Sequence, residues 1–177
     1  MQPVKLVSHS KVIFTSINFI NTFNCLSVTS FTEFLQGILE LRDKWSKESQ
    51  YAMGWEVPEQ RIWFDIPLLR APAWQSVHVL PSEYCDYMQE AIQFMEDNKA
   101  TEDYVDYRGF KDFEIAKAKR NLDIMKQDID VDKLRRDRAD FFKFFSEHDA
   151  RRDTNFLATF PEMHQFWQQC EEADALL

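Results

Sequence analysis

Val12-Ile-Phe-Thr-Ser-Ile-Asn-Phe-Ile20 is the stretch that decides the fold class, because β-branched and aromatic residues dominate it. Such a run predicts a β-strand over residues 12–20. Side chains of both parities are largely apolar, which is typical of a strand buried on both faces in a parallel sheet. The chain is therefore expected to begin its fold with a strand that needs cover on both sides.

A helix is predicted directly after this strand, from Ser30 to about Trp45. Ser30 and Glu33 form a capping-box pattern. Five apolar residues then fall on one helical face, at the i, i+3, i+4, i+7 and i+8 spacing: Phe31, Phe34, Leu35, Ile38 and Leu39. Residues 46–59 are predicted to be a loop, and extended segments are expected over 61–66 and 74–80. The strand–helix–strand order predicts a parallel pair with a right-handed crossover.

The remainder of the chain is predicted to be helical. Ser82 is expected to cap a helix over 83–97, and a heptad-like apolar seam runs from Ile115 to Ile129. Further helices are expected over 132–148 and from the Thr159/Glu162 capping box to Cys170. We therefore predict an α/β fold with two parts. A partial parallel, barrel-like β/α layer with few strands covers 1–97, and an all-helical extension covers 98–177.

Composition excludes several classes of function. The formal net charge is −9, so the overall field repels phosphate and argues against nucleic-acid binding. The chain has three cysteines far apart in sequence, which is not a disulfide framework and indicates a reducing, cytoplasmic compartment. A transmembrane helix requires roughly 18 or more consecutive apolar residues, and no such run exists. We therefore expect no membrane partner.

Complete catalytic motifs are absent from the sequence. Gly37, Gly54 and Gly109 are too scattered to build a phosphate-cradling loop. The four histidines show no metal-ligand spacing, and each cysteine is expected to be a small buried apolar residue. The basic run 133–138 is interleaved with aspartates, which predicts a charge-paired, solvated helix face. A hydrolase built on carboxylates is a further idea, but the sequence does not locate its site.

Polar side chains gather toward the end of the predicted first strand. Ser16 and Asn18 share one parity, and Asn21 and Asn24 follow in the next segment. Ligands of parallel α/β folds bind beyond the carboxyl ends of the strands, where amides can both donate and accept hydrogen bonds. These residues are thus candidates for ligand binding. The alternative interpretation is that they cap turns and satisfy loop backbone, as Asn commonly does.

Three stretches resemble a known family. The run from Ile13 to Asn24, followed by Ser30-Phe-Thr-Glu-Phe-Leu35, is similar to a late strand–loop–helix unit of radical S-adenosylmethionine (SAM) proteins. The similarity is to the phage and metagenomic group described as twitch-domain proteins. The stretch Pro72–Pro81 and the tail from His148 to Glu162 also resemble that group. The family's C-x-x-x-C-x-x-C motif, which ligates an iron–sulfur cluster, is absent here, as is its glycine-rich SAM-contact segment.

The resemblance implies that this chain is the C-terminal part of such an enzyme. The full-length protein would use SAM and a [4Fe–4S] cluster, whereas no cofactor is expected for this chain alone. Ser16, Asn18 and Asn21 would then line the SAM or substrate end of the barrel by position. The expected partner is the missing N-terminal half or another protein chain, and the uncovered edge favours self-association. The alternative hypothesis is a small acidic interaction or assembly module, of phage type, acting through its aromatic helices.

Overall fold

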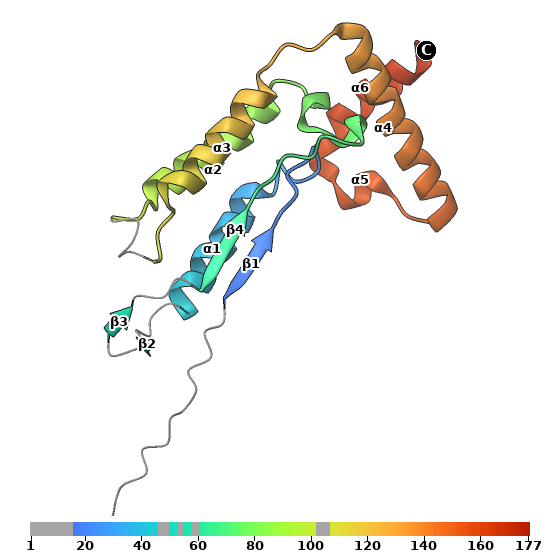
Figure 1. Ribbon diagram of the computed structural model, residues 1–177. Helices are drawn as coiled ribbons and strands as arrows, with labels where there is room; N and C mark the ends of the chain where they lie inside the picture. The colour runs from blue at the N-terminus through green and yellow to red at the C-terminus, as the bar shows by residue number, and fades with distance from the viewer. Residues whose placement is uncertain (1–15, 46–49, 53–54, 58–60, 102–106) are drawn as a thin grey trace, which may run out of the picture.

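The computed structural model describes residues 16–45, 50–52, 55–57, 61–101 and 107–177. These residues form a mostly helical molecule with two short sheets (Figure 1). The strands are β1 (Ile17–Ile20), β2 (Gln50–Ala52), β3 (Trp55–Val57) and β4 (Ile62–Asp65). The α-helices are α1 (Phe31–Trp45), α2 (Tyr84–Asp97), α3 (Asp112–Met125), α4 (Val131–Arg152), α5 (Phe156–Thr159) and α6 (His164–Ala175). The 3₁₀ turns are η1 (Ala73–Gln75), η2 (Val77–Val79) and η3 (Pro161–Met163).

The parallel β–α–β unit predicted from the sequence is confirmed. β1 pairs with β4 in parallel, with Ile17 opposite Ile62 and Ile20 opposite Asp65. α1 lies alongside this pair (Figure 1), and its predicted stripe is buried at Phe31, Leu35 and Ile38. A barrel-like layer is not shown, because the described strands form only a two-stranded parallel sheet and a two-stranded antiparallel one. The coarser prediction, an α/β chain with a helical C-terminus, holds.

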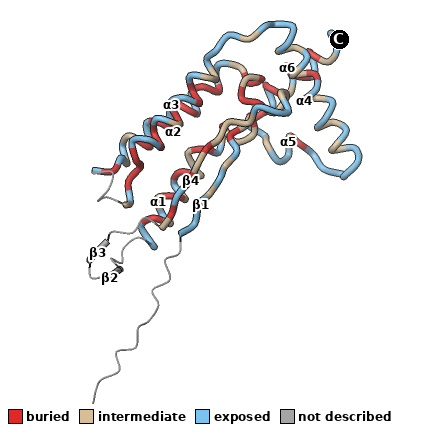
Figure 2. Tube along the Cα trace, viewed as in Figure 1, coloured by how far each residue is buried: buried red, intermediate tan, exposed pale blue. Residues whose placement is uncertain are grey.

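The burial expected for the first strand is wrong. Ile17 is 52% exposed and Ile20 is 68% exposed, and only Phe19 is packed against the core. The physical reason is that β1 has a single neighbouring strand, so its second edge and much of its outer face meet solvent. Figure 2 shows the contrast between the exposed β1 and the buried inner side of α1. Residues 12–15 of the predicted strand lie outside the described residues.

The extended segment predicted over 74–80 is also wrong, since η1 and η2 occupy it. Backbone hydrogen bonds from Gln75 N to Pro72 O and from Val79 N to Ser76 O close these turns. Tertiary packing outweighs β-propensity here. The ring of Trp74 lies 4.4 Å from that of Phe144 on α4, and Val77 and Val79 are buried in the core. Arg138 Nε on α4 donates to Val79 O at 2.8 Å.

Three smaller predictions need correction. The loop expected over 46–59 contains the β2–β3 antiparallel ladder, with Tyr51 opposite Glu56. The N-cap of α2 is Glu83 rather than Ser82, and no side chain caps it. The Thr159/Glu162 capping box does not form, because Phe160 stands at the N-cap of η3. The last predicted helix is accordingly divided into α5, η3 and α6. These are boundary errors that arise from local turn geometry rather than from the hydrophobic pattern.

An aromatic cluster joins the C-terminal helices. The ring of Phe141 on α4 lies 4.9 Å from that of Phe166 on α6 and 5.5 Å from that of Phe156 on α5. Phe156 stacks on Trp167 at 5.0 Å. Rings at such offset and edge-to-face separations add stabilisation beyond the area they bury. Phe141, Phe156 and Phe166 are buried, so these rings form core contacts between α4, α5 and α6.

Contacts across residue 97 are extensive, although the division into 1–97 and 98–177 stays a prediction. One hydrophobic cluster contains Phe64 and Phe110 from the two sides, with ring centroids 6.0 Å apart. Arg42 on α1 pairs with Glu114 on α3 at 2.6 Å, with side chains 0% and 1% exposed. Removing one partner of a buried ion pair leaves an uncompensated charge in the core. The helical extension is thus held to the β–α–β unit by charge as well as by apolar packing.

Glu114→Gln should lower the free energy of unfolding by about 3–5 kcal/mol, because Arg42 then stays buried without a counter-charge. Urea denaturation followed by circular dichroism measures this change. The matched control is Glu96→Gln, which removes the exposed pair with Lys119 and should cost about 0–1 kcal/mol. Equal losses in the two variants would contradict a special role for the buried pair.

Candidate functional site

The parallel sheet has one closed edge and one open edge. At the far edge of β4, Arg42 Nε donates to Ile62 O at 3.2 Å, and Asn121 Nδ2 donates to Ile66 O at 3.2 Å. Side chains from α1 and α3 therefore occupy backbone acceptors that a third strand would otherwise use. A polar side chain that satisfies an edge carbonyl is one way in which proteins prevent unwanted strand pairing. This edge is closed to further strands.

The edge of β1 carries no such cover from the described residues. The N–H groups of Ile17 and Asn21 donate to Arg61 O (2.7 Å) and Asp65 O (2.9 Å) across the ladder. Because backbone groups alternate in direction along a strand, those of Asn18 and Ile20 point away from β4. No described strand pairs with β1 on that side. Within the described part of the chain, β1 therefore presents a hydrogen-bonding edge that no strand occupies.

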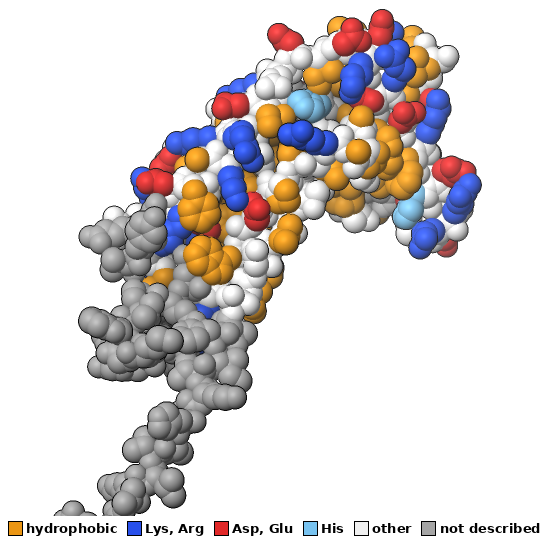
Figure 3. All heavy atoms as spheres, viewed as in Figure 1, with side chains coloured by type: hydrophobic (Ala, Val, Ile, Leu, Met, Phe, Trp, Pro, Cys, Tyr) orange, Lys and Arg blue, Asp and Glu red, His pale blue; other side chains and the backbone are white. Residues whose placement is uncertain are grey.

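Apolar side chains surround this free edge. Ile20 on β1 and Trp63 on β4, which is 37% exposed, lie on the outer face of the sheet, because they occupy the same parity in the parallel register. A groove of about 250 Å³ on the other side is lined by Ile17, Phe19, Leu41, Trp45, Arg61 and Ile62. On the face drawn in Figure 3, hydrophobic side chains reach the surface beside Lys and Arg. We call the β1 edge with Ile17, Ile20, Trp63 and Trp45 the open edge.

The predicted ligand-binding residues are not brought together as expected. Ser16 and Asn18 are exposed, and Ser16 stands before β1 rather than at its carboxyl end. Asn21 alone follows the strand, and its N–H continues the ladder to Asp65. None of these three residues belongs to the lining of the pockets described here. Their role in cofactor binding remains a prediction. Asn24 holds a turn, because its Oδ1 accepts from Leu26 N and its Nδ2 donates to Thr22 O.

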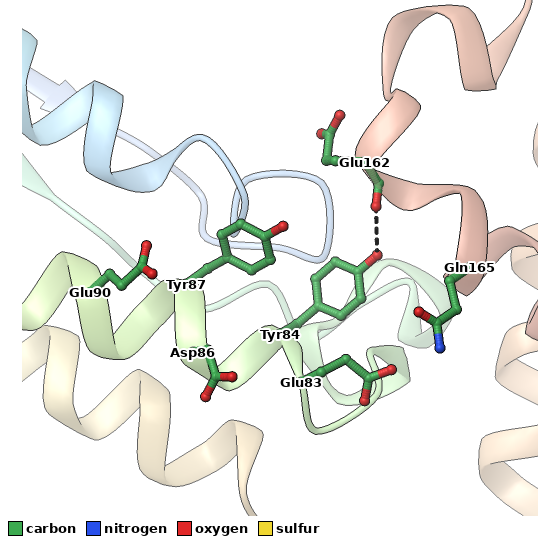
Figure 4. Close-up of a pocket in the computed structure, with 7 residues that line it drawn as sticks. All are labelled: Glu83, Tyr84, Asp86, Tyr87, Glu90, Glu162 and Gln165. Carbon is green, nitrogen blue, oxygen red and sulfur yellow. Dashed lines mark hydrogen bonds between the residues drawn. The ribbon is translucent and has the colours of Figure 1, made fainter.

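A second candidate is an acidic pocket of about 370 Å³ between α2 and the start of α6 (Figure 4). Its lining residues are Glu83, Tyr84, Asp86, Tyr87, Glu90, Glu162 and Gln165. The rings of Tyr84 and Tyr87 lie 5.8 Å apart, and Tyr84 OH donates to Glu162 O at 3.2 Å. Burial, with nearby Tyr87 and Glu162, raises the pKa of Tyr84 to about 12, so the phenol remains a donor. Such a pocket suits positively charged groups.

The three cysteines are unsuited to nucleophilic chemistry. Cys25, Cys85 and Cys170 are all buried and free. Burial raises the pKa of Cys25 far above that of an ordinary thiol, and it raises the pKa of Cys170 to about 12. The thiolate is the reactive species, so a thiol with a raised pKa is a poor nucleophile. Among the described residues, no three His, Cys, Asp or Glu side chains are grouped so as to hold a metal ion.

No helix in the described part combines the length and apolar character that a membrane span requires. The predicted charge pairing of the basic run is confirmed, with Lys133 bound to Asp137 at 2.5 Å and Arg135 to Asp132 at 3.1 Å.

Comparisons with protein-family models, with curated proteins and with solved structures found no match for this chain. The open edge and the pockets are therefore interpreted from their own geometry.

All three thiols should resist 5,5′-dithiobis(2-nitrobenzoate) in the native protein, even at mildly alkaline pH, because burial blocks access and raises their pKa values. In urea all three should react within the dead time of a manual assay. The measurement is the absorbance of the released thionitrobenzoate. Rapid labelling of one thiol in the folded protein would instead identify a reactive cysteine.

Proposed function

We propose that this chain completes its parallel sheet on another polypeptide segment, and that it acts as a docking part rather than as a catalyst on its own. The observation that carries this proposal is the asymmetry of the sheet, with Arg42 and Asn121 closing the β4 edge and nothing described closing the β1 edge. Two parallel strands are too few for a stable layer, since parallel sheets are normally buried in larger assemblies. A strand added at β1 supplies the missing neighbour.

Strand addition accounts for the chemistry of the open edge. Main-chain hydrogen bonds to Asn18 and Ile20 give such an interaction its affinity, and side-chain pockets on either face give it specificity. The groove beside Ile17 and Trp45 is one such pocket, and the surface around Ile20 and Trp63 is another. Both are apolar, so the incoming strand is expected to be rich in β-branched and aromatic residues.

The resemblance noted in the sequence suggests the class of partner. We propose that the partner segment is the cluster-binding β/α part of a radical SAM enzyme, encoded on the same polypeptide or on a separate one. This chain then contributes β1, β4 and a helical cap, with Asn21 at the carboxyl end of β1. What supports this proposal is the parallel β1–α1–β4 unit, which is the repeating element of β/α layers.

Ile20→Lys should abolish docking, because it places a charge on the open edge, at the carboxyl end of β1. The tagged chain is purified from the cells that produce it, and partners are identified by mass spectrometry. We expect a segment with a C-x-x-x-C-x-x-C loop, and iron with acid-labile sulfide in the anaerobically purified complex. The adjacent coding sequence gives an independent check within about 100–200 residues, the length of a missing domain.

Val131→Lys is the matched control for this variant, since Val131 on α4 is also β-branched and also 68% exposed. It should leave capture unchanged. Capture that survives Ile20→Lys would overturn docking at the open edge. Capture that Ile20→Lys abolishes, but of a partner without the cysteine loop, would retain docking and reject the radical SAM assignment.

The second candidate is an assembly module that acts through the aromatic C-terminal helices. The observation favouring it is Phe144 on α4, which is 44% exposed while its ring packs on Trp74 and stacks on His148. Deleting residues 110–177 would be a poor test of this candidate, because it also removes Glu114 and leaves Arg42 without its buried partner. A point change at Phe144 leaves that pair intact.

Phe144→Lys should leave partner capture unchanged if the open edge is the docking site, and should abolish it if the aromatic helices are. The same affinity purification measures both outcomes. Circular dichroism of the variant provides the control for folding, because Trp74 loses a ring contact in it. The pair of variants at Ile20 and Phe144 thus separates the two functions.

A further inference from the structure

A pocket with the opposite charge character lies beyond the carboxyl side of β4. Its volume is about 370 Å³, and we call it the basic pocket. Its polar lining consists of Arg70, Ser76, His78, Gln127 and Lys133. No Asp or Glu lines it, although the chain carries 30 acidic residues against 21 Lys and Arg. This local reversal of charge is a feature that packing alone does not require.

Four parts of the chain build the basic pocket. Arg70 comes from the segment after β4, Ser76 and His78 from the η1–η2 turns, Gln127 from the end of α3 and Lys133 from the first turn of α4. Leu68, at its base, forms a parallel bridge with Phe23, so the pocket lies where both parallel strands have ended. Ligands of open α/β sheets bind on this side of the strands.

Several of these polar groups lack partners within the protein. Ser76 is 5% exposed, yet its hydroxyl makes no hydrogen bond to any described residue. His78 Nδ1 is buried and is likewise without a partner in the described chain. Buried polar groups are normally hydrogen-bonded, so such groups lining a pocket indicate a missing ligand or ordered water. His78 Nδ1 is the strongest indicator, because it is a buried atom without a partner in the described chain and it belongs to the pocket wall.

The charges that face the pocket favour an anion. Arg70 forms no ion pair with the described residues, whereas Lys133 shares its charge with Asp137 at 2.5 Å. Burial lowers the pKa of His78, and Lys133 acts in the same direction while Asp137 opposes it. His78 is thus neutral near pH 7 and offers one donor and one acceptor. Arginine in particular matches the planar or tetrahedral oxygens of carboxylates and phosphates.

We infer that the basic pocket binds the oxyanion group of a small organic molecule, a phosphate or a carboxylate, with Arg70 as its main charged contact. Lys133 contributes a second cation at the rim, and the Ser76 hydroxyl and the Gln127 amide donate hydrogen bonds. Leu68 and Ile124 form an apolar wall for the remainder of the ligand. This site is separate from the open edge, and it does not depend on strand docking.

Titration of the full-length ¹⁵N-labelled chain, followed by NMR at constant ionic strength, tests this inference. The probes are inorganic phosphate, glycerol 3-phosphate, succinate and sodium chloride, each in a separate series. We expect saturable shifts of the backbone amides of Ser76, Gln127 and Lys133 with at least one oxyanion and none with chloride. Shifts with the phosphates alone would identify a phosphate ligand, and shifts with succinate alone would identify a carboxylate. Shifts with both would show that the pocket recognises the oxyanion chemistry that they share.

Arg70→Gln should weaken this binding by about tenfold or more, since it removes the strongest charge-assisted contact. Arg136→Gln is the matched control, because Arg136 is exposed on α4 and does not line the pocket. Its effect should stay below about twofold, as expected for a screened surface charge. Ser76→Ala is the second variant. If the spectrum of Arg70→Gln shows that this variant is unfolded, weaker oxyanion binding by Ser76→Ala is the test of the inference.

Three results would overturn the inference. These are shifts that follow ionic strength rather than the identity of the anion, shifts that fail to saturate, and equal weakening by the Arg70 and Arg136 variants. Shifts centred on the acidic pocket of Tyr84 and Glu162 would do the same, because that pocket repels anions.

Discussion

The buried pair of Arg42 and Glu114 is the interaction on which the rest of the structure depends. The Arg42 guanidinium donates to Glu114 Oε1 and Oε2, to Gly109 O and to Ile62 O, so it joins α1, β4, α3 and the segment before α3. It also lies 5.6 Å from the ring centroids of Phe64 and Phe110. A buried charge is tolerated only where its donors are occupied. Gly109, whose carbonyl accepts from Arg42, is also required to be glycine, because a Cβ there would lie 2.3 Å from Ala100 N. Charge, aromatic faces and close backbone approach thus fix one relative placement of the helices.

That placement also determines which surface of the sheet is left for other molecules. Arg42 and Asn121 occupy carbonyls on the β4 side, whereas no described side chain or strand occupies the edge of β1. A symmetrical pair of open edges would permit disordered aggregation in both directions. One open edge limits strand addition to one side of the sheet. Ile17 and Ile20 are exposed at this edge, and exposed apolar side chains that lie together are typical of interaction surfaces.

Hydrophobic periodicity was enough to predict α1 and α2, because each buries one regular stripe. The parallel pairing was predicted instead from the strand–helix–strand order. The hydrophobic periodicity of α1 also indicates the position of the buried Arg42–Glu114 pair. Phe31, Leu35, Ile38 and Arg42 continue one i, i+4 and i+3 series, which places Arg42 on the buried face of α1.

The segment 74–80 was not predictable, since the turns there form around Trp74, whose ring partners lie about 70 residues later on α4. The basic pocket was equally inaccessible, because residues near positions 70, 76, 127 and 133 meet only through the fold. Ser16 and Asn18 could not be placed from the sequence either. Polar residues at alternate positions of a strand do not show which face or end of that strand other elements cover.

The open edge and the basic pocket are related through the direction of the sheet. A parallel strand added to β1 ends on the same side as β1 and β4, which is the side where Leu68, Arg70 and Ser76 form the pocket. The loop that follows such a strand would therefore bring partner residues toward the pocket rim. Ligand binding does not require such a strand, because the residues that line the pocket all belong to this chain.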